Sequence, residues 1–91
     1  MRNDMSEFYS NVDVTIRFDD VIKIIQYNSD REHLTTKRDI LDKLQLEDTK
    51  KNRKLLLKVT DELKKRNIIE TTFGINEDES GYRGRGYMIK E

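Results

Sequence analysis

Six residues able to bind nucleic acid fall within nine positions near the middle of the chain. They are Lys50, Lys51, Asn52, Arg53, Lys54 and Lys58. Lysine and arginine bind phosphate and donate to O6 and N7 of guanine, and asparagine can bridge N6 and N7 of adenine. Because residues four apart stack on one side of a helix, Lys50, Lys51, Lys54 and Lys58 are expected to lie broadly on one basic helical face. These residue types at this spacing predict contact with double-stranded DNA.

A second basic group lies near the C-terminus. Tyr82, Arg83 and Arg85 alternate with glycines, which let a side chain approach a groove closely, and a narrow minor groove attracts arginine. Three carboxylates, Glu77, Asp78 and Glu79, precede this group and would repel a phosphate backbone. We therefore expect only its second half to touch DNA.

Two predicted helix starts complete the set of candidate DNA-binding residues. Thr36 begins a helix, with Asp39 three residues later as an acidic variant of the capping box, so Lys37 and Arg38 lie in its first turn. Asp48 or Thr49 caps the next helix, whose free N–H groups are suited to phosphate. Lys64, Lys65 and Arg66 at the end of that helix are better explained as partners of the helix dipole.

The elements that position these residues follow from periodicity, turn residues and caps. We expect one domain over 1–91, which begins with an arm over 1–11 and a strand or extended segment over 12–18. A helix capped by Asp19 follows and ends near Asn28. After it we expect a helix-turn-helix over 36–66, whose long helix spans 49–66, and a hairpin over 68–90 with strands 69–75 and 85–90. His33–Thr35 could add a brief strand, and Asn67 is a plausible left-handed helix stop.

The apolar residues of the long helix recur at helical spacing and predict its buried side. Leu55, Leu56, Val59 and Leu63 form this stripe. The two earlier helices offer Val21, Ile24 and Ile25, with Ile22 beside them, and Ile40, Leu41 and Leu44. We expect Val59 and Leu63 to pack on Ile24, Ile25, Ile40 and Leu41.

The order of helix, short helix, long helix and hairpin resembles the winged-helix superfamily of DNA-binding domains, of the type found in microbial and viral transcription regulators. The resemblance covers Leu34 to Ile89, about three fifths of the chain. LKKRNIIE is similar to a recognition helix running into the wing, and GRGY to the returning strand; Asn67 replaces the usual glycine. The resemblance implies an α+β fold, with helix 49–66 in the major groove and wing 76–86 on the backbone or minor groove.

Composition excludes several other classes of protein. There is no cysteine, one histidine (His33, expected in a loop) and no apolar run of membrane-spanning length. We expect no enzyme, cofactor or metal, and a cytoplasmic protein (host cytoplasm if viral). The net charge is zero, but residues 37–66 carry +5 against −3 for 1–36 and −2 for 67–91. The basic charge is therefore concentrated on the predicted helix-turn-helix.

We expect a sequence-specific regulator of transcription, acting as a homodimer on two half-sites of double-stranded DNA. Two alternatives stay open: a winged helix used for protein contact, and a plasmid or phage replication or partition protein. Phe8, Tyr9, Tyr27, Leu57 and strand 12–18 are the candidate dimer contacts.

Overall fold

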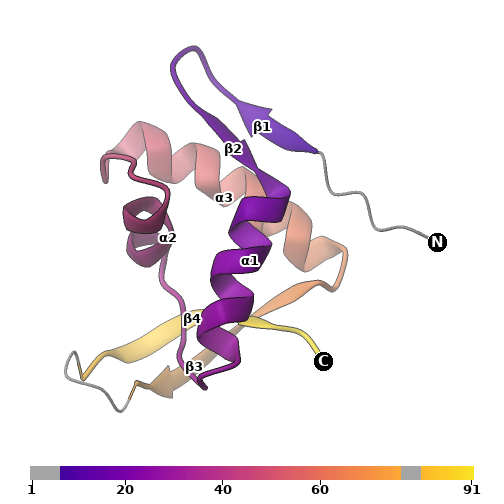
Figure 1. Ribbon diagram of the computed structural model, residues 1–91, viewed down its shortest axis with the longest axis vertical. Helices are drawn as coiled ribbons and strands as arrows, with labels where there is room; N and C mark the ends of the chain where they lie inside the picture. The colour runs from indigo at the N-terminus through magenta and orange to yellow at the C-terminus, as the bar shows by residue number, and fades with distance from the viewer. Residues whose placement is uncertain (1–6, 77–80) are drawn as a thin grey trace.

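The computed structural model is a small α+β domain of three helices and two two-stranded antiparallel sheets (Figure 1). It describes residues 7–76 and 81–91. The elements are β1 (Phe8–Ser10), β2 (Thr15–Arg17), α1 (Phe18–Ser29), α2 (Lys37–Lys43), α3 (Lys50–Lys65), β3 (Ile69–Ile75) and β4 (Arg83–Ile89). We call β1 with β2 the N-terminal hairpin, and β3 with β4 the C-terminal hairpin.

The first helix begins two residues earlier than the sequence predicts. Arg17, not Asp19, is its N-cap, and no side chain caps it. Asp19 lies instead in the first turn with Asp20, where carboxylates favour the positive end of the helix dipole. The cap prediction was wrong because the extended strand β2 delivers the chain directly into the helix, which leaves Asp19 inside it.

The two later helices have the caps that the sequence predicts. Thr36 and Asp39 form a reciprocal capping box at α2: the Asp39 N–H donates to Thr36 Oγ1 at 3.1 Å, and the Thr36 N–H to Asp39 Oδ2 at 3.0 Å. Thr49 caps α3 by accepting from the Asn52 N–H at 3.1 Å. Asn67 follows α3 with φ +62°, the predicted left-handed stop.

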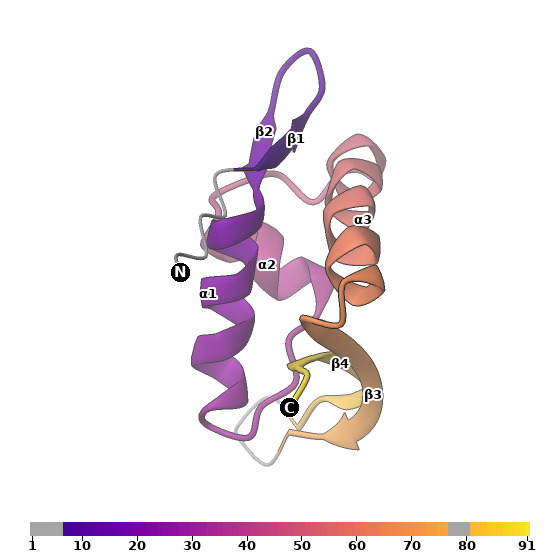
Figure 2. The same ribbon diagram turned by 90° about the vertical axis from the view of Figure 1, so that its right-hand side faces the viewer.

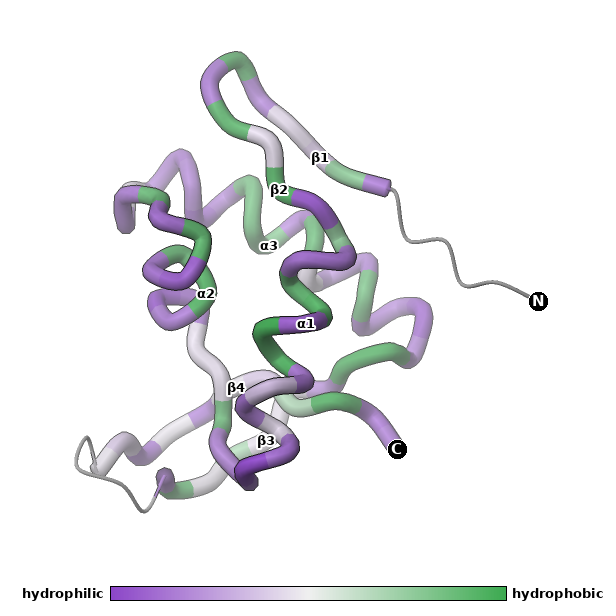
Figure 3. Tube along the Cα trace, in the orientation of Figure 1, coloured by the Kyte–Doolittle hydropathy of each residue, from purple (hydrophilic) through white to green (hydrophobic). Residues whose placement is uncertain are grey.

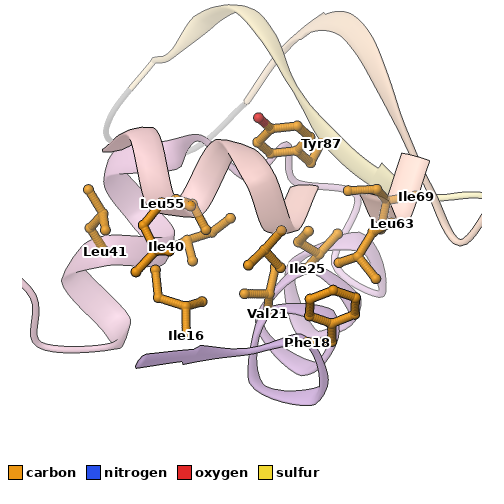
Figure 4. Close-up of a cluster of buried hydrophobic side chains, with 12 residues drawn as sticks. Ile16, Phe18, Val21, Ile25, Ile40, Leu41, Leu55, Leu63, Ile69 and Tyr87 are labelled. Atoms are coloured by element: carbon orange, nitrogen blue, oxygen red, sulfur yellow. The ribbon is translucent and has the colours of Figure 1, made fainter. Parts of the chain in front are cut away.

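The core collects one stripe from each helix (Figure 4). All four predicted residues of α3 are buried, with Ile40 and Leu41 of α2 and Val21 and Ile25 of α1; Ile22, Ile24 and Leu44 are partly buried. Phe18, Ile16, Ile69 and Tyr87 complete the cluster. Burying each large apolar side chain stabilises the fold by roughly 1.5–3 kcal/mol, so this cluster fixes the position of α3.

The N-terminal hairpin replaces the predicted arm and single strand. β1 pairs with β2, with Tyr9 opposite Ile16, and the turn closes when Asn11 Oδ1 accepts from the Asp13 and Val14 N–H groups. Val12 lies at the turn and is 94% exposed, and Phe18 belongs to α1. Residues 12–18, predicted as a strand or extended segment, therefore form a turn, a three-residue strand and a helix start.

The C-terminal hairpin agrees with the predicted strands, and β4 starts two residues early. Ile69 pairs with Ile89, and Ile75 with Arg83 at the distal end. The predicted brief strand before α2 is a single bridge between Thr35 and Tyr87. Gly86 permits this bridge, because a Cβ there would lie 2.8 Å from Leu34 Cβ. The alternation in β3 buries Ile69 but leaves Phe73 and Ile75 exposed, because the hairpin extends beyond the helices.

The two hairpins lie at opposite ends of the helical body (Figures 1 and 2). Helix α3 spans the distance between them, and its hydropathy alternates along its length (Figure 3). No helix among the described residues combines the length and apolar character needed to cross a membrane. The fold thus places the most basic helix between two hairpins.

Candidate nucleic-acid interface

Helix α3 presents different chemistry on each side. One flank carries Lys51 and Arg66, which pair with Asp13 and Glu7 of the N-terminal hairpin region. The opposite flank carries Arg53, Leu57 and Lys64, which line a groove against the C-terminal hairpin. Between these flanks, opposite the buried stripe, lies the solvent face of the helix.

The solvent face holds three lysines in register. Lys50, Lys54 and Lys58 are exposed and four residues apart, as the sequence predicts for one helical face. Within residues 7–76 and 81–91, none of the three forms an ion pair, whereas Lys23, Lys51 and Lys64 each do. Their positive charge is therefore directed to solvent, with no ion-pair partner in the part of the chain that the structure describes.

The groove beside this face has a volume of about 300 Å³ and combines four cations with a partly apolar floor. Its lining comprises Lys37 of α2, Arg53, Leu57 and Lys64 of α3, and Thr71, Arg85, Gly86 and Tyr87 of the hairpin, with Thr36 at the cap. No carboxylate lines it among residues 7–76 and 81–91. The groove brings together basic residues from three separate elements, which is suited to a polyanion.

A second hollow of about 660 Å³ adjoins the groove and shares Lys37 and Arg53 with it. Arg38 and Tyr82 also line this hollow, so predicted residues from α2, α3 and the C-terminal hairpin meet there. Asp39 and Asp42 line it as well. Its mixed charge makes it a weaker candidate for phosphate than the groove.

Arg53 is held by an internal carboxylate. Its guanidinium donates to both oxygens of Asp48, with Nη2 at 3.0 Å from Oδ2. This hydrogen bonding lowers the pKa of Asp48 and raises that of Arg53. Both side chains are exposed, and exposed ion pairs of this kind add little to stability because water and salt screen them. A phosphate can therefore compete with Asp48 for Arg53.

Asn52 departs from the expected role of contacting adenine. Its side chain is buried, and Nδ2 donates to the Glu47 carbonyl at 2.9 Å. This bond ties the turn between α2 and α3 to the start of α3. Position 52 lies on the core side of the helix because it precedes Leu56 by one turn, so we leave Asn52 out of the proposed interface.

Tyr82, which comes just before β4, is turned back onto that strand. The Tyr82 hydroxyl donates to the Arg85 carbonyl at 2.6 Å, and a Cβ on Gly84 (φ +153°) would lie 2.8 Å from that hydroxyl. Arg83 and Arg85 are exposed and, in the described part of the chain, form no ion pair. Glu77, Asp78 and Glu79 lie outside the described residues.

Two residues line this groove in addition to the roles that the sequence predicts for them. Leu57, expected at a dimer contact with Phe8 and Tyr9, lines the groove on the flank of α3 that faces away from β1. Lys64, expected to serve the helix dipole, lines it too. Spacing could have found both, since positions 53, 57 and 64 share one helical flank.

Asn76 is a residue that sequence reasoning missed. It is buried at the end of β3, where its amide accepts from the Leu34 N–H at 2.8 Å and donates to the Leu34 carbonyl at 3.2 Å. It looked like an ordinary turn residue because its partner lies 42 positions away. This contact fixes the hairpin against the segment that leads into α2.

Comparison with known proteins finds no matching family model, no matching curated protein and no matching solved structure. Among the described residues, no group of three or more histidine, cysteine or acidic side chains is placed to hold a metal ion. The function is therefore inferred from the geometry and charge of the chain itself.

Proposed function

We propose that the protein is a winged-helix, sequence-specific double-stranded DNA-binding protein that regulates transcription. In this proposal α3 is the recognition helix and enters the major groove. The C-terminal hairpin is the wing, and Arg83 and Arg85 contact the adjacent backbone or minor groove. Lys37 and Arg38 contact phosphates at the start of α2.

The observation that carries the proposal is the concentration of basic side chains across three elements. The three lysines of the α3 solvent face border a groove that, among the described residues, is lined by four cations and no carboxylate; of these cations, Arg53 and Lys64 pair with Asp48 and Asp61 outside the lining. A duplex offers a phosphate backbone beside a groove edge, so one helix face can meet bases while its flank meets phosphates. The chain's zero net charge makes this concentration a local feature of one face.

The experiment compares two triple variants of equal charge change. Replacing Lys50, Lys54 and Lys58 with alanine removes the solvent-face cations, whereas replacing Lys23, Lys43 and Lys90 removes exposed cations elsewhere. Fluorescence anisotropy with a labelled duplex is measured over a range of salt. With about six phosphate contacts, the wild-type log–log slope should be about −5, and it should become shallower by roughly 2–3 only in the first variant.

Sequence specificity is measured separately, by selecting bound sequences from random duplex DNA. A defined motif supports a regulator, and a palindrome supports two half-sites read by a dimer. Equal losses in the two triple variants, or a flat salt response, would count against α3 as the DNA-contacting helix.

A further inference from the structure

The outer edge of β3 has no partner strand. β3 pairs with β4 on one side, and β4 is itself covered at Tyr87 by the bridge to Thr35. On the other side of β3, no backbone hydrogen bond joins its edge to any described residue. The C-terminal hairpin therefore ends in a seven-residue edge strand.

The bridge to Thr35 identifies which backbone groups of β3 point outward. Tyr87 exchanges hydrogen bonds with Thr35 at 2.8 and 3.1 Å, so its N–H and C=O point away from β3. Thr71 lies directly opposite Tyr87 in the register. In an antiparallel pair, two opposed residues either bond to each other or both point their N–H and C=O groups away from each other. The N–H and C=O of Thr71 therefore point away from β4. The alternation along a strand gives the same direction to Phe73 and Ile75.

The side chains on this edge are apolar and exposed. Phe73 is 60% exposed and Ile75 is 56% exposed, next to Arg85 and Arg83 on the same face of the hairpin. Natural edge strands commonly carry lysine, proline or a bulge that prevents pairing. β3 has neither lysine nor proline, and Glu70 is its one charged residue.

We propose that β3 pairs with β3 of a second copy of this chain, antiparallel and centred on Phe73, to form a continuous four-stranded sheet. In this register Phe73 faces Phe73 of the second copy, and Thr71 faces Ile75 of the second copy, twice by symmetry. Each of these pairs exchanges two backbone hydrogen bonds, because all the outward groups belong to these residues. The two phenyl rings lie side by side on one face.

The edge is complementary to itself, which is why the partner is a second copy. On the other face, Thr72 meets Gly74 of the second copy, and Glu70 meets Asn76 of the second copy, so no like charges are opposed. A two-fold contact requires one patch to fit itself. β1 and β2 are also edge strands, but with three residues each they offer far fewer backbone groups.

The pairing also has a consequence that depends on the proposed function. A two-fold axis perpendicular to the sheet keeps the same face of both hairpins on one side. Arg83 and Arg85 of both copies then lie on that side, which is also the side where α3 packs through Thr60 and Tyr87. One dimer would thus present two recognition helices to one duplex.

The first test measures self-association without DNA, by sedimentation equilibrium. Phe73→Lys puts a charge at the centre of the contact, and Phe8→Lys puts one on the exposed N-terminal hairpin as a matched control. We expect Phe73→Lys to raise the dimer Kd at least about 30-fold, as loss of a central aromatic anchor does, and Phe8→Lys to leave it unchanged. Wild-type protein that stays monomeric up to about 1 mM would overturn the proposal.

The second test fixes the register and retains Phe73. The chain contains no cysteine, so introduced cysteines report only on their own positions. In the double variant Thr71→Cys with Ile75→Cys, each cysteine faces its counterpart with Cα atoms about 5.5 Å apart, within disulfide range. Mild oxidation should yield a covalent dimer, and Phe8→Cys should not. Equal cross-linking of both would overturn the register.

These measurements separate the dimer from DNA binding because neither includes DNA. A monomeric protein with the predicted salt-dependent duplex affinity would overturn the dimer and leave the proposed function standing. A β3-linked dimer without duplex affinity would do the reverse.

Discussion

The two hairpins border the same helix, but one places acidic side chains beside it and the other places arginines beside it. The N-terminal hairpin region brings carboxylates to α3: Asp13 pairs with Lys51 at 3.1 Å, and Glu7 pairs with Arg66. The C-terminal hairpin brings arginines instead, and Arg83 and Arg85 form no ion pair in the described part of the chain. One flank of α3 is thus neutralised, while the other is left more positive.

The same difference appears in their packing. The short N-terminal hairpin is anchored by Ile16, which is buried in the core, and by the edge-to-face contact of Tyr9 with Phe18, whose ring centroids are 5.3 Å apart. The longer C-terminal hairpin is anchored at its base and extends away with Phe73 and Ile75 exposed. A hairpin whose side chains serve the core stabilises the fold, and one whose side chains are exposed is available for binding.

The largest effect is expected at the buried anchor of the N-terminal hairpin. Ile16→Ala should lower the free energy of unfolding by about 2–5 kcal/mol, because it removes buried methyl groups and leaves a cavity. Val12→Ala in the same hairpin is the control, since Val12 is exposed at the turn. Urea denaturation measures both. Equal stability of the two variants would mean that the N-terminal hairpin does not support the core.

A smaller loss of stability is expected at the distal end of the C-terminal hairpin, where Asn76 follows β3. Asn76→Ala removes both hydrogen bonds to the buried Leu34 backbone, which should cost about 1–3 kcal/mol. Asn11→Ala, at the exposed turn of the N-terminal hairpin, should cost under about 1 kcal/mol. Thermal unfolding followed by circular dichroism compares them. If Asn11→Ala lowered the stability more than Asn76→Ala, Asn76 would not be an anchor of the C-terminal hairpin.

The charge difference between the hairpins predicts a difference in duplex affinity. Replacing both Arg83 and Arg85 with alanine should weaken binding by about 1–3 kcal/mol, the size of a good contact. Arg17→Ala removes one exposed arginine from β2; it is compared with Arg83→Ala and Arg85→Ala taken singly and should leave affinity unchanged. Anisotropy titrations against one specific and one random duplex measure this. Similar losses would show that the two hairpins do not differ in DNA contact.

Local patterns in the sequence were sufficient to predict much of this fold. The capping box at Thr36, the apolar stripe of α3 and the stop at Asn67 each depend on residues a few positions apart. Such features can be predicted because their energetics are settled within one or two helical turns. The position of the basic lysines on α3 follows from the same periodicity.

Long-range contacts account for what the sequence did not reveal. β1 could not be identified because three residues carry no period, and its pairing with β2 depends on the core position of Ile16. Asn76 and Asn52 looked like exposed polar residues, but both satisfy buried backbone groups. The ion pair of Lys51 with Asp13 spans 38 positions, so the loss of that lysine from the free basic face was invisible in the sequence.

The smallest effect is expected in the pH dependence of the N-terminal hairpin region. Hydrogen bonds from Arg66 hold the pKa of Glu7 below its ordinary value, so the folded state favours the ionised carboxylate. The contact therefore stabilises the fold above the ordinary glutamate pKa of about 4.3 and is lost as the pH falls through the lower folded value. Arg66 also pairs with Glu62 and lies 5.3 Å from the Phe18 ring, so it stays in place when Glu7 is removed. Glu7→Gln should lower the melting temperature slightly at neutral pH, and its difference from wild type should shrink steadily in acid. A difference that is constant across pH would mean that Glu7 acts through packing and not through its charge, and the contrast between the hairpins would then concern shape alone.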